Sequence, residues 1–185
     1  MSYLKLPGPE DLSGKTKELI EDCINRWGYA PNIVRAYSLA PEVMEAEDVW
    51  SKGVMHTGFL PRKLKEGIAT VVSAANTCNY CASSHAHAYT LAGGDEQEGQ
   101  ACRLLDFSEF DAKDSAAFEF ARKATPDANA ITKADIEKLQ EHYTDGEIVE
   151  IATVIQQFMG YNWFVTMLGL ELEEDNPIKN LESIG

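Results

Sequence analysis

The sequence predicts an all-α protein, and three features of its 185 residues support this prediction. The chain holds 21 alanines, and alanine has the highest helix propensity of all residues. The apolar–polar alternation that is typical of a half-buried strand is almost absent. Prolines stand where helices could begin and glycines where helices could stop. These positions are Pro31, Pro41 and Pro61 for the starts, and Gly28, Gly58, Gly93, Gly94 and Gly169 for the stops.

The spacing of apolar residues and these boundaries predict nine helices. Ser13 and Thr132 are expected N-caps, and Asp135 follows Thr132 at the distance of a capping box. The expected helices cover residues 14–27, 31–39, 41–57, 61–75, 78–92, 96–105, 111–124, 132–143 and 145–168.

The segment 145–168 is apolar on nearly all sides, which predicts a helix buried centrally or at a subunit interface. The pair of helices within 61–92 carries the residues with the most chemistry and is the expected functional centre. No internal repeat or linker divides the chain, so we expect one domain over residues 1–185, with a core over about 30–170 and an acidic tail over 171–185.

The net charge of −14, from 16 Lys and Arg against 30 Asp and Glu, repels phosphate groups. Nucleic acid and anionic membranes are therefore poor partners for this chain. No apolar run is long enough to span a membrane, and the first residues, MSYLKLPGPEDL, contain no apolar signal core. We therefore expect a cytoplasmic protein.

Two of the four cysteines stand as Cys78-Asn79-Tyr80-Cys81, and His85 follows one helical turn later. At 100° per residue, the two cysteines and His85 share one stripe of a helix that begins near Cys78. Residues three apart on a helix are close enough for a disulfide. In a chain without an export signal, this spacing indicates redox or metal chemistry.

The start of this helix favours a reactive thiol, because free backbone N–H groups in the first turn stabilise a thiolate. Its position favours Cys78 as the more activated thiol, whereas proximity to His85 favours Cys81. A histidine can move the thiol proton, and a carboxylate can fix the tautomer of that histidine. Glu66 on the preceding helix is the candidate carboxylate and can meet His85 if the two helices pack antiparallel.

The pattern E-x11-C-x2-C-x3-H, formed by Glu66, Cys78, Cys81 and His85, resembles the signature of alkylhydroperoxidase D-like (AhpD-like) proteins of the carboxymuconolactone decarboxylase superfamily. The similarity covers roughly residues 30–170. Tyr80 stands where some members of the family carry a histidine. A tyrosine at this position resembles the sub-group labelled peroxidase-related. The closing helix of the family often carries Asn-Arg, whereas Asn162-Trp163 stands here, so no arginine role transfers to that place.

This resemblance implies an all-helical fold of mostly antiparallel helices packed around a CxxC-bearing helix, in a homo-oligomer such as a dimer, trimer or hexamer. It implies a thiol-dependent peroxidase that reduces organic hydroperoxides through a Cys78/Cys81 dithiol–disulfide cycle, with Glu66 and His85 as a proton relay. It favours Cys81 as the thiol served by the relay. The expected electron donor is a thioredoxin-like or lipoyl-bearing dithiol, and no cofactor other than the Cys78–Cys81 disulfide is expected.

Other interpretations remain open from the residues alone. The two cysteines could be small buried hydrophobic residues, or they could bind zinc with His85 and His87, although His87 falls on the far side of the same helix. Tyr80 could pack in the core or line a substrate mouth. At the level of function, the alternatives are a carboxymuconolactone decarboxylase-like enzyme, which needs no redox pair, and a non-enzymatic redox-sensing helical oligomer.

Overall fold

The computed structural model describes residues 2–173, and all regular secondary structure within them is helical. The elements are, in chain order, η1 (Pro9–Asp11), α1 (Gly14–Trp27), α2 (Asn32–Tyr37), α3 (Pro41–His56), α4 (Arg62–Ala75), α5 (Asn79–Leu91), α6 (Glu96–Leu104), α7 (Ala112–Ala124), η2 (Ala128–Ala130), α8 (Lys133–Gln140) and α9 (Asp145–Leu168).

The nine helices expected from the sequence are all present, and most ends fall within a residue or two of the expected ones. Thr132 caps α8 through the expected capping box with Asp135, whereas Ser13 caps α1 without a side-chain hydrogen bond. The expected helix 132–143 is too long, because α8 ends at Gln140. The acidic tail lies outside the described residues beyond residue 173.

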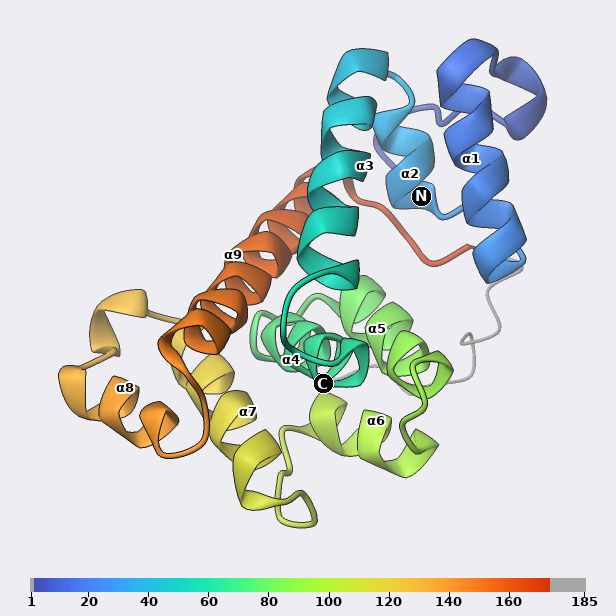
Figure 1. The fold of residues 1–185 in the computed structure, drawn as a ribbon. Coiled ribbons are helices and arrows are strands. Elements are labelled where there is room, and N and C mark those ends of the chain that lie inside the picture. The colour runs from blue at the N-terminus through green and yellow to red at the C-terminus, as the bar shows by residue number, and fades with distance from the viewer. Residues whose placement is uncertain (1, 174–185) are drawn as a thin grey trace.

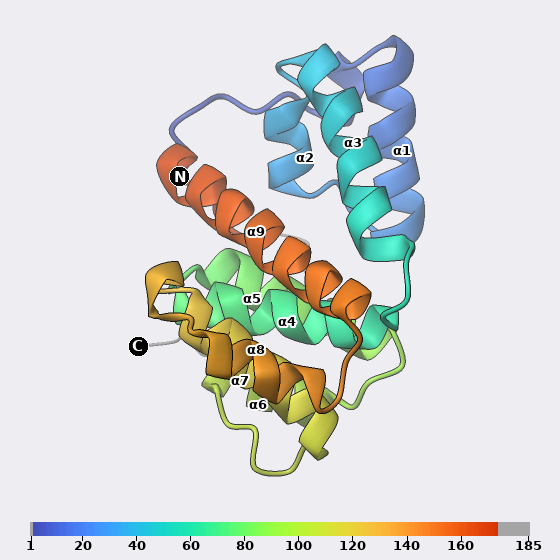
Figure 2. The same cartoon turned by 60° about the vertical axis from the view of Figure 1, so that its left-hand side comes forward.

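The helices form two groups joined by the long helix α9 (Figures 1 and 2). Helices α1, α2 and α3 lie together at one end of the molecule, and α4 to α8 lie together at the other. Helix α9 runs diagonally between the groups and packs against α3, α4, α5, α7 and α8. The functional centre expected within residues 61–92 therefore lies where α4 and α5 meet α9 and the first group.

Helix α4 is the centre of the core, because nearly all of its residues are buried. Two glycines allow its neighbours to come close. A Cβ atom at Gly67 would lie 2.7 Å from the Phe118 ring of α7. A Cβ atom at Gly99 of α6 would lie 2.9 Å from the Ala86 carbonyl oxygen of α5. Substituting either glycine would push apart helices that enclose the α4–α5 pair.

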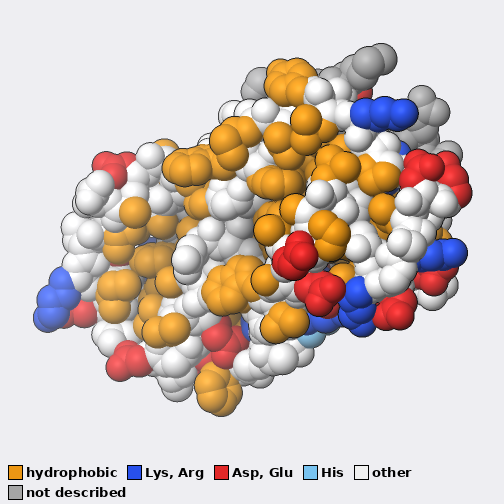
Figure 3. All heavy atoms as spheres, turned by 90° about the horizontal axis from the view of Figure 1, so that it is seen from above, with side chains coloured by type: hydrophobic (Ala, Val, Ile, Leu, Met, Phe, Trp, Pro, Cys, Tyr) orange, Lys and Arg blue, Asp and Glu red, His pale blue; other side chains and the backbone are white. Residues whose placement is uncertain are grey.

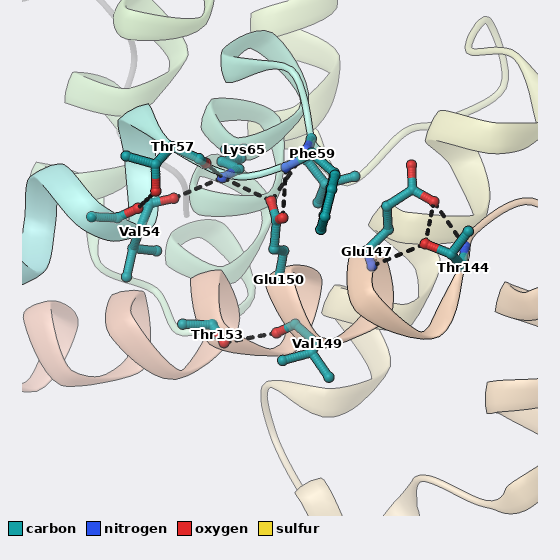
Figure 4. Close-up of polar contacts among 11 residues, drawn as sticks. Val54, Thr57, Phe59, Lys65, Thr144, Glu147, Val149, Glu150 and Thr153 are labelled. Carbon is teal, nitrogen blue, oxygen red and sulfur yellow. Dashed lines mark hydrogen bonds and ion pairs between the residues drawn. The ribbon is translucent and has the colours of Figure 1, made fainter.

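The connection between α3 and α4 is fixed to α9 by a buried ion pair (Figure 4). Lys65 is 1% exposed, and its Nζ lies 3.0 Å from Glu150 Oε2 of α9. The same Nζ donates to the backbone oxygens of Val54 and Thr57 at 2.8 and 2.5 Å. Glu150 also accepts hydrogen bonds from the backbone N–H groups of the connection, at Phe59 and Leu60. Because the buried charge is fully paired, it holds the start of α4 in place.

Helix α9 is not buried on all sides in the single chain, so the first of the two expected alternatives, central burial, is wrong. Ile151, Val154 and Phe158 face the core, whereas Val149, Trp163 and Met167 are more than half exposed. Figure 3 shows broad groups of hydrophobic side chains on one face of the molecule. Among residues 2–173, no helix has both the length and the apolar character that crossing a membrane requires.

Candidate functional site

The two candidate cysteines stand at a tight turn between α4 and α5. Thr77 takes a left-handed backbone conformation with φ 54°, which turns the chain sharply after α4. The Cys78 N–H then donates to the Ser73 carbonyl oxygen at 2.9 Å. Cys78 is therefore the N-cap of α5. The sequence-based prediction that Cys78 lies in the first turn of this helix is wrong. The second cysteine, Cys81, lies within the first turn.

The two thiols interact with each other and have pKa values shifted in opposite directions. Hydrogen bonding from the Cys81 thiol, aided by the Thr166 hydroxyl, lowers the pKa of Cys78 despite burial. The hydrogen bond to Cys78 and burial raise the pKa of Cys81 well above its ordinary value. Of the two thiols, Cys78 therefore ionises first as the pH rises.

Glu66 and His85 meet across the α4–α5 pair. Glu66 Oε2 lies 2.6 Å from His85 Nδ1, and the Glu66 side chain is fully buried. Although burial opposes ionisation, His85 and then Arg62 lower the pKa of Glu66, so the group is a carboxylate. A carboxylate at Nδ1 favours the tautomer with its proton on that nitrogen. The second ring nitrogen, Nε2, is then free to accept a proton.

Arg62 is a site residue that the sequence analysis missed. It stands one turn before Glu66 on α4, and its Nε donates to Glu66 Oε1 at 2.6 Å, while Nη2 forms a close ion pair with the same oxygen. Its remaining nitrogen, Nη1, is buried and has no hydrogen-bond partner among the described residues. The i,i+4 spacing of opposite charges was the signal that could have found it.

A cavity of about 160 Å³ lies between the first group of helices and the α4–α5 pair. Cys81, His85 and Arg62 are on its wall, and Cys78 is not. The ring of Phe158 from α9 packs edge-on against His85, with 4.4 Å between centroids. Cys81 and His85 therefore border the same space, which is enclosed mainly by apolar groups.

Tyr80 also lines this cavity and is 8% exposed. Its hydroxyl donates to Glu173 Oε1 at 2.7 Å and accepts from the Ile33 N–H at 3.3 Å. Burial and the Glu173 carboxylate raise the pKa of Tyr80 well above its ordinary value, so the phenol stays protonated. Tyr80 thus combines both alternatives left open by the sequence: it packs in the interior and forms part of the cavity wall.

The remaining cysteines lie elsewhere in the fold. Burial raises the pKa values of both Cys23 and Cys102, so both are thiols at neutral pH. Cys102 is fully buried in the core, and Cys23 lines the cavity from α1. Within residues 2–173, no three His, Cys, Asp or Glu side chains come together as ligands of a metal ion.

Residues 41–123 match the model of the carboxymuconolactone decarboxylase family. A search of curated proteins finds no match. The structure resembles a peroxidase-related protein from Silicibacter sp. TM1040, with 29% identity, a TM-score of 0.87, and coverage of 95% of this chain and 93% of the other.

The chain has the AhpD-like fold, and residues 41–123 resemble the carboxymuconolactone decarboxylase family. Two further structures share this AhpD-like fold. One is the alkylhydroperoxidase AhpD core of a peroxidase-related protein from Ralstonia eutropha JMP134, with 22% identity, a TM-score of 0.87, and coverage of 94% and 93%. The other is the debrominase Bmp8 in complex with 2,3,4-tribromopyrrole, with 21% identity, a TM-score of 0.80, and coverage of 91% and 90%.

Proposed function

We propose that this protein is a thiol-dependent peroxidase that reduces organic hydroperoxides. The observation that carries the proposal is the contact of 2.6 Å between Glu66 and His85, with His85 and Cys81 on the wall of one cavity. This arrangement supports a mechanism in which a proton acceptor and a thiol act on the same bound molecule. General acid–base catalysis of this kind contributes roughly 10²–10⁴-fold to a rate.

In the proposed reaction, Cys81 is the attacking thiol because it is the one that borders the cavity. His85 accepts the Cys81 proton, and the resulting thiolate attacks the terminal peroxide oxygen. The O–O bond breaks, the alkoxide takes the proton from His85, and an alcohol leaves. Cys81 is then a sulfenic acid. Arg62 also lines this cavity, and its positive charge favours the oxygen on which negative charge develops.

Cys78 completes the cycle. Its thiolate attacks the Cys81 sulfur, the S–O bond breaks, and the Cys78–Cys81 disulfide forms, while the departing hydroxide takes a proton from the solvent and leaves as water. A dithiol reductant of the thioredoxin-like or lipoyl-bearing class then returns two electrons and two protons. The lowered pKa of Cys78 supports this role, because it increases the thiolate fraction of the resolving cysteine. The cycle requires no other cofactor.

We further propose that the protein is a cytoplasmic homo-oligomer with neither nucleic acid nor membranes as partners. The net charge of −14 supports the exclusion of anionic partners. Exposed apolar residues on α3 and α9, among them Val49, Val149, Trp163 and Met167, favour contact with a second copy. Sedimentation velocity would then show a species heavier than the 20.5 kDa chain.

The experiment that tests the proposed peroxidase is a turnover assay with tert-butyl hydroperoxide and several dithiol reductants. We expect turnover by the parent, none by Cys81→Ser, and a rate at least about tenfold lower for His85→Ala. Cys78→Ser should retain a single turnover that stops at the sulfenic acid, whereas the buried Cys102→Ser should match the parent. A parent rate no greater than that of Cys81→Ser would refute the proposal.

The same assay separates the peroxidase from its alternatives. A decarboxylase-like enzyme on this fold would act on its own substrate class without consuming a dithiol. A non-enzymatic redox sensor would form the disulfide but show no sustained turnover. Reductive debromination, the chemistry that the name of Bmp8 indicates, would release bromide from brominated pyrroles at the expense of the same two thiols.

A further inference from the structure

The cavity that borders Cys81 has a second polar end, formed by a carboxylate that the proposed reaction does not use. Glu47 of α3 lines the cavity, and its carboxylate accepts a hydrogen bond from the Tyr161 hydroxyl of α9. Gln157 donates to that hydroxyl at 3.1 Å. Burial raises the pKa of Glu47 above its ordinary value, and burial together with the Glu47 carboxylate raises the pKa of Tyr37 to about 12.

A continuous wall of rings joins this end to the thiol end. Phe158 contacts His85 on one side, with 4.4 Å between ring centroids, and Tyr161 on the other, with 5.4 Å. Both contacts are edge-on, so one side of the cavity runs from His85 across two rings to Glu47. The aromatic residues that line the cavity are Trp27, Tyr29, Tyr37, Tyr80, Phe158 and Tyr161.

The charges of the cavity wall leave Glu47 without a cation. Arg62 pairs with Glu66, and Lys52 pairs with Asp48 at 2.9 Å. The third cation, Arg26, pairs with Asp22 at 3.0 Å. Of the two histidines on the wall, His85 is held by Glu66, while burial and then Arg62 lower the pKa of His56 and keep it neutral.

A carboxylate that is partly removed from water and lacks a counter-charge carries a desolvation cost. A cationic ligand offsets this cost by forming a charge-assisted hydrogen bond. Aromatic rings around such a carboxylate add cation–π attraction, and cages of this type bind organic ammonium groups. The few polar groups of an apolar cavity set the orientation of its ligand. The ammonium end would therefore lie at Glu47 and the reacting end at Cys81.

We propose that Glu47 binds a protonated amine of the substrate, whose apolar or aromatic body lies along Phe158 with its reacting group at Cys81. This assignment of a substrate class rests on the proposed peroxidase function. The physiological substrate is then an organic hydroperoxide that carries a cationic nitrogen at the end opposite to its peroxide.

The test uses three ligands that share one body and cannot react with the thiols: para-isopropylbenzylamine, para-isopropylbenzyl alcohol and para-isopropylbenzoate. Their affinities for the reduced full-length protein are measured by isothermal titration calorimetry near neutral pH. We expect the amine to bind about tenfold or more tightly than the alcohol, and the benzoate to bind most weakly. Equal affinity for amine and alcohol, tightest binding of the benzoate, or no binding of the amine would overturn the proposal.

Variants assign the preference to one carboxylate. Glu47→Gln keeps an acceptor for Tyr161 and should lose the amine preference, whereas Glu47→Asp should keep it in part. Glu45→Gln is the matched control, because Glu45 is exposed on the same helix and does not line the cavity. If Glu47→Gln keeps the preference, the proposal is wrong. If Glu47→Gln does not fold, the affinities of the three ligands for the parent and for Glu47→Asp still test the proposal.

The result is independent of whether the protein turns over peroxide. Amine binding through Glu47 without hydroperoxide turnover would contradict the proposed function and leave this binding site standing. Turnover of tert-butyl hydroperoxide without any preference for the amine would support the proposed function and contradict the amine-binding site at Glu47.

Discussion

The sulfur of Cys78 differs from the other three cysteine sulfurs in the direction of its pKa shift. A hydrogen bond from the Cys81 thiol lowers the pKa of Cys78, while the pKa values of Cys23, Cys81 and Cys102 are all raised. The sequence placed both cysteines on one helical edge but could not decide which one carries the charge. That choice depends first on the hydrogen bond between the two thiols and then on Thr166, which contacts Cys78 only after α9 has packed against the α4–α5 turn.

The first prediction at this scale concerns the titration of Cys78. Cys81→Ala removes the thiol that donates to Cys78, so the pKa of Cys78 should rise. At a fixed pH near 7, a higher pKa means less thiolate. The pH dependence of the ultraviolet thiolate absorbance, taken as the difference from Cys78→Ser, measures this shift. Cys102→Ala should leave the curve in place, and an unchanged curve in Cys81→Ala would contradict the assignment.

Some residues that line the cavity could be predicted from the sequence, and others could not. Glu66 and His85 were found because the spacing of the motif names them, and their contact required only that α4 and α5 pack side by side. Glu47 was not found. Its partner Tyr161 is 114 positions away, and nothing local in α3 distinguishes Glu47 from the exposed Glu42 and Glu45.

At the scale of elements, the helices were predictable because their boundaries are local. Pro41 begins α3, while Gly28 and Gly169 take left-handed conformations at the ends of α1 and α9. The ion pair between Lys65 of α4 and Glu150 of α9 was not predictable, because a lysine within a helix is usually solvated. Lys65 is buried only because Glu150, 85 positions later in the chain, and the backbone oxygens of Val54 and Thr57 converge on it.

The second prediction concerns the contribution of the Lys65–Glu150 ion pair to stability. Lys65→Met leaves the half-buried Glu150 without its cation and two backbone oxygens without their donor, and unsatisfied groups of this kind cost about 1–3 kcal/mol. Lys133→Met is the matched control, because the Lys133–Glu137 pair is largely exposed and such pairs contribute about 0–1 kcal/mol. Urea unfolding of both variants and the parent measures the difference. Equal urea midpoints of unfolding for the two variants would show that the Lys65–Glu150 ion pair does not hold α4 in place.

At the scale of the whole molecule, the arrangement of the two helix groups creates the site. The two thiols and the proposed proton relay come from α4, α5 and the turn between them, whereas much of the cavity wall comes from α1 to α3 and from α9. The sequence predicted the all-α class and the centre within residues 61–92. It could not predict the cavity, because that space depends on how the first group packs against α9 (Figure 2).

The most direct test of the proposed dithiol chemistry counts the thiols of the whole chain after one oxidation. The chain has four cysteines, all free in the reduced protein described above. One equivalent of cumene hydroperoxide should oxidise two of them, with mass spectrometry locating the new disulfide between Cys78 and Cys81 and one equivalent of alcohol released. Four thiols remaining after the peroxide is added, or a disulfide that involves Cys23 or Cys102, would contradict the account.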